Sequence, residues 1–315
     1  MVSLKSAAAT RPFPRRAQAL KARDANTPIM ALAARLWPYV AALLRARRTP
    51  LLVGISGLQG SGKSTLASAL LRVARQHGVG AVRLALDDVY LGRAARQRMA
   101  RTQHPLWLTR GVPGTHDVAL LCATLRALRH ASGAQPARLP RFDKGRDTRR
   151  PPSRWPRVTA MPALIVLEGW CLGVQPQSAE QLLHPLNALE RHEDRDGRWR
   201  RAVNAALAAY APLWDALDLR ILLHAPGFAV ASRWRAQAEA ALRTRAAPRA
   251  MGSAQLRRFM QHYQRLSEHA LATLPRWADV RVDLDAAHGA GALRVARGLR
   301  ARLAQGAGST TTAVP

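Results

Sequence analysis

The sequence predicts an α/β fold, in which a parallel sheet is covered by helices on both faces and carries a helical insertion. Two observations support this prediction: near-continuous apolar runs alternate with segments of helical periodicity, and polar turns close the runs. The length of 315 residues allows one large domain with insertions, and a hydrophobic content of 48% is enough for a packed core. These values argue against a largely disordered chain.

Five short apolar runs are the expected strands, because strands buried on both faces of a sheet are apolar along their whole length. They cover residues 51–56, 81–86, 163–167, 217–223 and 279–284. Helices are expected where apolar residues recur at helical spacing. They cover residues 28–45, 64–75, 117–130, 228–245, 253–274 and 292–303.

Three features qualify this element pattern. Pro38 lies inside the first expected helix and should kink or split it. Residues 132–162 are rich in Pro, Arg and Gly, which predicts a long loop facing solvent. Residues 177–211 form a polar segment that we expect to be helical with breaks at proline.

The chain carries 49 Lys and Arg against 19 Asp and Glu, a formal net charge of +30. Such a charge attracts polyanions, among them nucleic acid, anionic lipid and phosphorylated small molecules. The even spread of arginine and the abundance of alanine favour a compositional bias over a dedicated nucleic-acid surface. We therefore expect small-molecule partners and no nucleic acid.

Cysteine usage and hydropathy indicate the compartment. The two cysteines lie in apolar surroundings without CxxC spacing, which indicates reduced thiols and no zinc site. No run of 18 apolar residues occurs, so we expect no membrane span. The first 23 residues lack acids and also lack an apolar signal segment, which favours a basic disordered arm. These features predict a cytoplasmic protein.

The strongest motif is GLQGSGKST at residues 57–65, which follows an apolar strand and opens a helix. This context is typical of a P-loop, whose backbone N–H groups bind phosphate at a helix N-terminus. Lys63 can reach the β- and γ-phosphates of a nucleotide, and the Ser64 hydroxyl can bind Mg²⁺. The residues expected to bind ATP are Gly57, Gly60, Ser61, Gly62, Lys63, Ser64 and Thr65. The sheet is therefore expected to be of the P-loop NTPase type.

Carboxylates follow two later strands, where the ends of parallel strands meet the ligand crevice. Asp87 and Asp88 end the strand at 81–86, and one of them could deprotonate an acceptor hydroxyl; helix capping is the alternative. Which of the two would be the base stays open. Glu168 ends the strand at 163–167, where P-loop proteins place the acidic residue of the metal site. A plain strand-ending glutamate is the alternative there.

Two polar loops, RGVPGTHD at residues 110–117 and LPRFDK at 139–144, could line an acceptor pocket or form turns. Arg233 and Arg235 lie near the start of the helix expected at 228–245 and could form a lid over phosphates. A solvated arginine face is the alternative. Residues 184–194 combine His, Glu and Asp without HExxH spacing, which favours a solvated acidic turn over a metal site.

In these motifs the chain resembles the plant-type D-glycerate 3-kinase family and its bacterial relatives. That family lies within the group of P-loop kinases that includes uridine kinase, phosphoribulokinase and pantothenate kinase. The resemblance rests on the motifs above together with LDDVY at 86–90 and LEGWCLG at 167–173, and spans residues 28–284. Further matches lie at 186–190, 196–204 and 233–239. Val89 replaces the usual Phe, and the loop at 145–150 is shorter than the plant pattern.

The resemblance implies a kinase that uses ATP and Mg²⁺. It implies catalytic roles for Lys63, Asp87 and Glu168, with Mg²⁺ held by Ser64 and Glu168. The residues expected to meet the acceptor are Asp88, Tyr90, Arg110, His116, Asp117, Arg141, Asp143 and Lys144.

The predicted function is transfer of the γ-phosphoryl group of ATP to a hydroxyl of a small metabolite, with D-glycerate as the expected acceptor. A nucleoside, a pantothenate-like acid, a nucleic-acid-stimulated ATPase and a regulatory ATP-binding protein are the alternatives. The expected organisation is a disordered arm at 1–27, a kinase domain at 28–303 and a disordered tail at 304–315. Insertions at about 91–162 and 174–212 should bind the acceptor. The sequence leaves the oligomeric state open.

Overall fold

A six-stranded sheet forms the centre of the protein, in a computed structural model that describes residues 28–244 and 251–308. The strand order is β10-β9-β8-β1-β7-β2, and all neighbours are parallel except β10 and β9. The strands are β1 (Leu51–Gly57), β2 (Ala81–Ala85), β7 (Leu164–Gly169), β8 (Leu219–His224), β9 (Val280–Leu284) and β10 (Ala290–Val295). The predicted α/β class with a P-loop-type sheet is confirmed.

The centre of the sheet is its most buried part. Every residue of β1 and β7 is buried, as expected for strands covered on both faces. In the parallel register, Glu168 of β7 is the partner of Ile55 on one side and of Ala85 on the other. The segments that follow β1, β2 and β7 therefore leave the sheet at the same edge.

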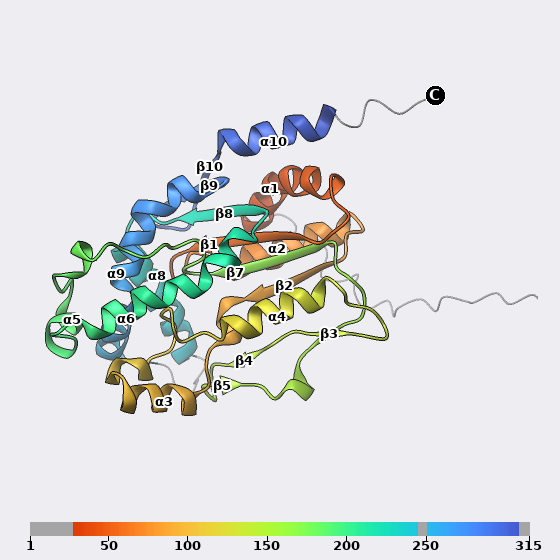
Figure 1. The fold of residues 1–315 in the computed structure, drawn as a ribbon. Coiled ribbons are helices and arrows are strands. Elements are labelled where there is room, and N and C mark those ends of the chain that lie inside the picture. The colour runs from red at the N-terminus through yellow and green to blue at the C-terminus, as the bar shows by residue number, and fades with distance from the viewer. Residues whose placement is uncertain (1–27, 245–250, 309–315) are drawn as a thin grey trace, which may run out of the picture.

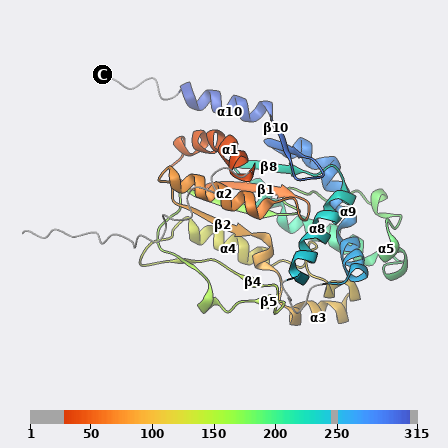
Figure 2. The ribbon, with the colours of Figure 1, turned by 180° about the vertical axis from the view of Figure 1, so that it is seen from behind.

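Helices cover both faces of the sheet (Figures 1 and 2). Helices α1 (Pro28–Arg45) and α2 (Lys63–Gln76) pack together on the face seen in Figure 2. Helix α6 (Arg198–Ala206) crosses the opposite face, and α4 (Val118–Leu128) lies beyond β2. Helices α8 (Phe228–Thr244) and α9 (Ser253–Trp277) pack against each other near the carboxyl ends of the strands.

The insertions hold shorter elements. The first contains α3 (Arg93–Thr102), which we did not predict, and four two-residue strands inside the predicted loop: β3 (Ala137–Arg138), β4 (Phe142–Asp143), β5 (Thr148–Arg149) and β6 (Arg157–Val158). β4 and β5 pair as an antiparallel hairpin. The second contains α5 (Ala188–Glu193), α6 and α7 (Ala211–Asp215).

The C-terminal prediction was wrong in one place. Residues 290–295 form the edge strand β10, paired with β9, and not the start of the expected helix. Helix α10 (Arg297–Gly308) begins later and extends beyond the predicted end at residue 303. Pro38 lies inside α1, which continues as one helix through it. The predicted arm at 1–27 and residues 309–315 of the predicted tail lie outside the described residues.

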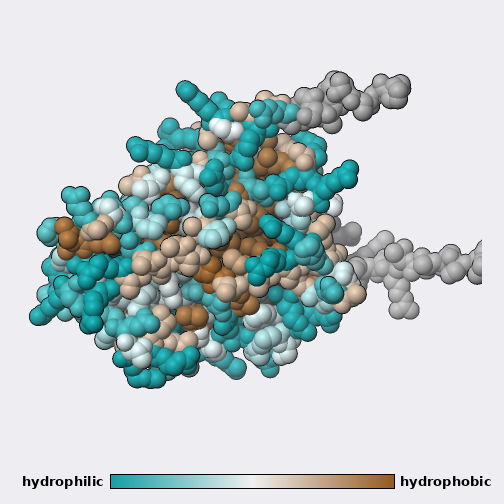
Figure 3. Space-filling view, viewed as in Figure 1, coloured by the Kyte–Doolittle hydropathy of each residue, from teal (hydrophilic) through white to brown (hydrophobic). Residues whose placement is uncertain are grey.

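In the described part of the chain, no helix is both long and apolar enough to cross a membrane. On the face in Figure 3, hydrophilic side chains occupy most of the outline, and hydrophobic ones lie toward the middle.

Candidate active site

The P-loop connects β1 to α2 and places helix N–H groups at the edge of the sheet. Gly60 and Gly62 have φ angles of +79° and +85°, a left-handed conformation that glycine adopts without strain. A Cβ atom at Gly60 would lie 2.6 Å from Cβ of Trp234, so α8 packs directly on the loop. Lys63 begins α2, and the partial positive charge of the helix N-terminus favours an anion there.

Lys63 is a buried cation held within the loop. Its Nζ atom donates a hydrogen bond of 2.8 Å to the carbonyl oxygen of Leu58. Burial lowers the pKa of Lys63, and the nearby Glu168 and Asp87 carboxylates oppose this shift. The ammonium group is therefore surrounded by acceptors on one side and faces the cleft on the other.

Ser64 and Glu168 form a pair of oxygen donors beside Lys63. The Ser64 hydroxyl donates a hydrogen bond of 2.6 Å to Oε1 of Glu168. Burial raises the pKa of Glu168, while Lys63 and the Ser64 hydrogen bond lower it. A hydroxyl and a carboxylate side by side supply the hard oxygen ligands that Mg²⁺ prefers.

Asp87 lies in a 3₁₀ turn (Leu86–Val89) that directly follows β2. Its Oδ1 accepts a hydrogen bond of 2.7 Å from the Tyr90 hydroxyl, and its Oδ2 accepts one of 2.7 Å from Lys144 Nζ. Burial alone would raise the pKa of Asp87, but Lys144 and these hydrogen bonds lower it to about 2. Asp87 is therefore an ionised carboxylate with two oriented donors.

Asp88 has different partners from its neighbour. Arg141 donates a hydrogen bond of 3.2 Å to Oδ2 of Asp88, and the Phe142 N–H donates one of 3.3 Å to Oδ1. Burial raises the pKa of Asp88, opposed by the charge of Arg141. Asp88 therefore fastens the start of the 142–149 hairpin and does not line the cleft described next.

These groups meet in a cleft of about 330 Å³ at the carboxyl edge of the sheet. The predicted site residues that line it are Gly60, Lys63, Ser64, Asp87, Tyr90, Arg110, Lys144, Glu168 and Arg235. The cleft also contains residues that we did not predict: Gln59, Trp170, Ala238, Phe259 and Tyr263. The cleft is therefore formed by the P-loop, the segments that carry Asp87 and Glu168, the 142–149 hairpin, and helices α8 and α9.

Several of the unpredicted residues hold the motif loops in place. Tyr263 donates a hydrogen bond of 2.7 Å to the carbonyl oxygen of Arg110, and the Trp170 indole donates one of 2.8 Å to that of Gly111. The side chains of Gln59 and Ser61 each carry buried polar atoms without a hydrogen-bond partner. Buried polar atoms are normally bonded, so these atoms are suited to bind a polar ligand at the loop. Trp170 stood in the LEGWCLG motif and could have been found there; Tyr263 and Phe259 carried only a helical apolar pattern.

The remaining predicted acceptor residues lie around the cleft. His116 is buried, stacks on Tyr90 at 4.8 Å between ring centroids and shares a hydrogen bond of 2.7 Å with Tyr210. Asp117 caps α4 through the Leu120 N–H and pairs with Arg149 at 2.8 Å.

Three more predicted residues, Arg141, Asp143 and Arg233, do not line the cleft. Asp143 accepts a hydrogen bond of 3.0 Å from the Arg146 N–H inside the hairpin turn. Arg141 pairs with Asp88 as described, and Arg233 is exposed on α8. Arg235, which does line the cleft, pairs with Glu239 at 2.6 Å, one turn further along α8.

A second pocket of about 360 Å³ lies on the other side of the P-loop. It is lined by Ser61, Gly62 and Thr65 of the loop and by apolar residues from α1 and the 287–290 turn. His288 in that turn stacks on Trp234 at 4.3 Å and shares a hydrogen bond of 2.9 Å with the Gly60 carbonyl. Gly57, the first residue of the motif, ends β1 at φ +153°.

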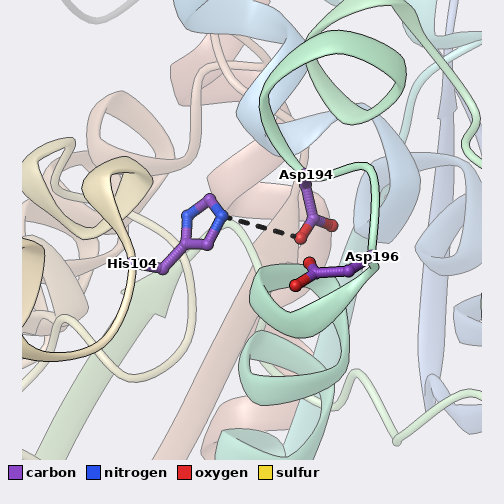
Figure 4. Close-up of side chains that lie close together, drawn as sticks. All are labelled: His104, Asp194 and Asp196. Atoms are coloured by element: carbon purple, nitrogen blue, oxygen red, sulfur yellow. Dashed lines mark ion pairs between the residues drawn. The ribbon is translucent and has the colours of Figure 1, made fainter.

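One cluster of possible metal ligands lies away from the cleft. His104, Asp194 and Asp196 lie close together, with His104 Nε2 3.9 Å from Asp194 Oδ1 (Figure 4). The Asp194 carboxylate already has hydrogen-bond partners, because it accepts hydrogen bonds from the Trp199 N–H at 2.8 Å and from the Arg200 side chain. The two aspartates therefore accept N–H groups at the start of α6. Asp194 and Glu190 are both buried, and Glu190 pairs with Arg265, so the expectation of a solvated turn at 184–194 was wrong for these two residues.

Comparison with known proteins identifies relatives. No protein-family model matches the chain. It is 33% identical over 241 residues to the uncharacterized kinase mug58 of Schizosaccharomyces pombe, across 71% of this chain and 82% of that protein. It is 33% identical over 203 residues to the chloroplastic D-glycerate 3-kinase of Arabidopsis thaliana, across 62% of this chain but only 42% of that protein. A solved structure of D-glycerate 3-kinase from Cryptococcus neoformans shares the fold, with a TM-score of 0.69, 23% identity and coverage of 84% and 99%.

Proposed function

This chain belongs to the D-glycerate 3-kinase family of P-loop kinases, and from that membership we propose that it transfers the γ-phosphoryl group of ATP to a hydroxyl of D-glycerate. The family predicted from the motifs is thereby confirmed, and the chain is an ATP-dependent kinase. The observation that best supports the proposed reaction is that Lys63, Asp87 and the Ser64–Glu168 pair line one cleft.

The nucleotide would lie across the P-loop. Backbone N–H groups at the start of α2 and the Lys63 ammonium bind the phosphates, as the unpartnered atoms of Gln59 and Ser61 indicate. The apolar pocket beside Thr65 has the character required for the base of ATP. Lys63 exchanges its hydrogen bond to the Leu58 carbonyl for one to a phosphate oxygen.

The Ser64–Glu168 pair fits a magnesium ion, since both side chains offer oxygen at the edge of the phosphate site. When bound, the ion would offset phosphate charge near the group that is transferred. Glu168 also keeps the Ser64 hydroxyl oriented toward that edge.

Asp87 is the proposed base. Its carboxylate is ionised because Lys144 and Tyr90 stabilise the negative charge, and it lies in the cleft, whereas Asp88 bonds to Arg141 and Phe142. Asp87 would orient the acceptor hydroxyl and take its proton as the new oxygen–phosphorus bond forms. The bond between the γ-phosphorus and the bridging oxygen breaks in the same step, and ADP leaves. Most of the rate acceleration would come from alignment and from positive charge around the phosphoryl group.

The test is release of ADP from Mg²⁺-ATP by purified protein. D-glycerate, uridine and pantothenate are compared with a sample that has no acceptor and with one that holds single-stranded DNA. Release that depends on D-glycerate supports the proposal. Release that depends on uridine, pantothenate or DNA, or ATP binding without any release, would overturn it in favour of the corresponding alternative.

A further inference from the structure

A second cavity of about 280 Å³ adjoins the cleft, and the two share Arg110, Lys144, Arg235 and Phe259 among their lining residues. Away from the P-loop, this cavity is lined by Arg96 and Asp147. It therefore begins beside the proposed base, through Lys144, and ends at a buried arginine.

Arg96 is an unusual residue for a helix of exposed arginines. It belongs to α3, yet only 2% of its surface is exposed. Its Nε atom donates a hydrogen bond of 3.1 Å to the Leu91 carbonyl, and its Nη1 atom donates one to the Leu108 carbonyl. These two bonds fix the plane of the guanidinium group and direct Nη2 toward Asp147.

Asp147 lies between two arginines. Its Oδ1 is 2.5 Å from Arg110 Nη1, and its Oδ2 is 2.7 Å from Arg96 Nη2. The second contact is an ion pair without hydrogen-bond alignment, so the buried Nη2 of Arg96 has no aligned acceptor. The backbone of Asp147 has φ +55°, a left-handed conformation that a turn imposes on few residues other than glycine. The 142–149 hairpin thus delivers this carboxylate to the arginines.

The cations that line the cavity exceed their carboxylate partners by one positive charge. Its cations are Arg96, Arg110, Lys144 and Arg235. Lys144 pairs with Asp87 and Arg235 pairs with Glu239, so these four groups cancel. Arg96 and Arg110 share the single carboxylate of Asp147. Two guanidinium groups, one of them buried, thus have a single carboxylate between them, which favours a ligand that brings one negative charge.

We propose that Arg96 and Arg110, held by Asp147, bind the carboxylate of a monoanionic hydroxy acid and so determine the choice of acceptor. This inference rests on the proposed function, since it assumes that the acceptor hydroxyl lies at Asp87. The shared lining of the two cavities lets a short acceptor place its carboxylate at the arginines and its hydroxyl at the base. Arginine suits this role because its planar N–H groups match a carboxylate.

The test compares Arg96→Lys with Arg101→Lys, a matched change at an exposed position of the same helix. Arg96→Lys should raise KM for D-glycerate roughly tenfold to hundredfold, the usual effect of losing a charge-assisted hydrogen bond. KM for ATP should be unchanged, and Arg101→Lys should behave as the wild type. A purely structural role for Arg96 would instead lower the unfolding temperature and affect both substrates.

A second variant keeps the proposal testable if Arg96→Lys fails to fold. Asp147→Asn leaves two uncompensated guanidinium groups, so inhibition by the dianion tartronate should strengthen relative to inhibition by the monoanion glycolate. An unchanged tartronate-to-glycolate ratio, or an unchanged KM for D-glycerate in Arg96→Lys, would overturn the carboxylate site while leaving the kinase reaction in place.

Calorimetric titration of the wild type with D-glycerate, glycolate and glycerol in the presence of Mg²⁺-ADP separates the two proposals. Binding of the acids without any turnover of D-glycerate would overturn the proposed reaction and support the carboxylate site. Turnover of D-glycerate, together with glycerol binding as tightly as the acids, would support the proposed reaction and overturn the carboxylate site.

Discussion

Lys144 Nζ donates a hydrogen bond of 2.7 Å to Oδ2 of Asp87, although 57 residues separate the two in the chain. The contact forms because Asp88 holds the strand that opens the 142–149 hairpin, through the Phe142 N–H. The two aspartates after β2 therefore have different roles. Asp88 holds the hairpin in place, and Asp87 accepts a hydrogen bond from Lys144 of that hairpin.

Asp87→Asn should reduce kcat by roughly 10²- to 10⁴-fold, because an amide cannot accept the hydroxyl proton. ATP binding should be retained, since Lys63 and the P-loop are untouched. Steady-state ADP release and titration with ATP measure the two effects. Asp88→Asn is the control and should cost less than tenfold in kcat; turnover that survives in Asp87→Asn would remove Asp87 from the role of base.

Lys144→Met should move the acid limb of the kcat profile toward neutral pH. With the wild-type pKa at about 2, Asp87 is ionised above about pH 4 and imposes no acid limb there. Loss of the lysine charge and hydrogen bond leaves burial as the main influence, and burial raises the pKa of Asp87. Profiles of kcat against pH check this, with Lys144→Arg as the charge-preserving control. Coincident limbs in wild type and Lys144→Met would contradict it.

Ser64→Ala and Glu168→Gln should each raise the Mg²⁺ concentration needed for half-maximal activity by roughly tenfold or more, since losing even a hydrogen-bond partner of a metal ligand has an effect of that size. Each substitution removes one oxygen of the pair that lies 2.6 Å apart. Ser68→Ala is the matched control on the same helix, because the Ser68 hydroxyl donates to the Ser64 carbonyl and lies outside the cleft. An unchanged magnesium requirement in both variants would rule out this pair as the metal site.

His116 should make the protein less stable in acid. Burial lowers its pKa to about 4, whereas an unfolded histidine has a pKa of about 6.5, so the unfolded chain binds the proton first. The stability from neutral His116 is complete above pH 6.5 and is lost as pH falls toward 4, by on the order of 3 kcal/mol.

His116→Phe should flatten this part of the stability profile, measured by urea unfolding between pH 7 and 4. Some slope will remain, because burial also lowers the pKa of His262 to about 4. The exposed His130→Gln is the control and should retain the wild-type slope. If His116→Phe also retains that slope, protonation of His116 does not limit acid stability.

Gly111→Ala should destabilise the protein by about 1–3 kcal/mol and disturb the cleft. Gly111 has φ +121°, and a Cβ atom there would lie 2.8 Å from Cε1 of Tyr263. The tyrosine would have to leave the Arg110 carbonyl that it now holds. Urea unfolding measures the loss, with Gly133→Ala as a control because no atom lies within 4 Å of its added Cβ. Equal stability of the two variants would contradict the packing argument.

The sequence by itself determined the parts that are local in the chain. The five parallel strands were predictable because burial on both faces demands continuous apolar runs, and the P-loop because its contacts come from one contiguous segment. Strand β10 was missed because its Ala, Leu and Arg residues favour a helix, whereas pairing with β9 decides its conformation.

Only the tertiary structure decided which charged side chains line the two cavities. LPRFDK marked Asp143 and Lys144 alike, but the hairpin turn uses Asp143 for its own backbone and sends Lys144 to Asp87. Arg96 was one arginine among many until the Leu91 and Leu108 carbonyls fixed it beside Asp147. Such pairings depend on distance in space, because a hydrogen bond forms only between atoms in contact and Coulomb attraction weakens as charges separate. The spacing of residues along the sequence does not give these distances.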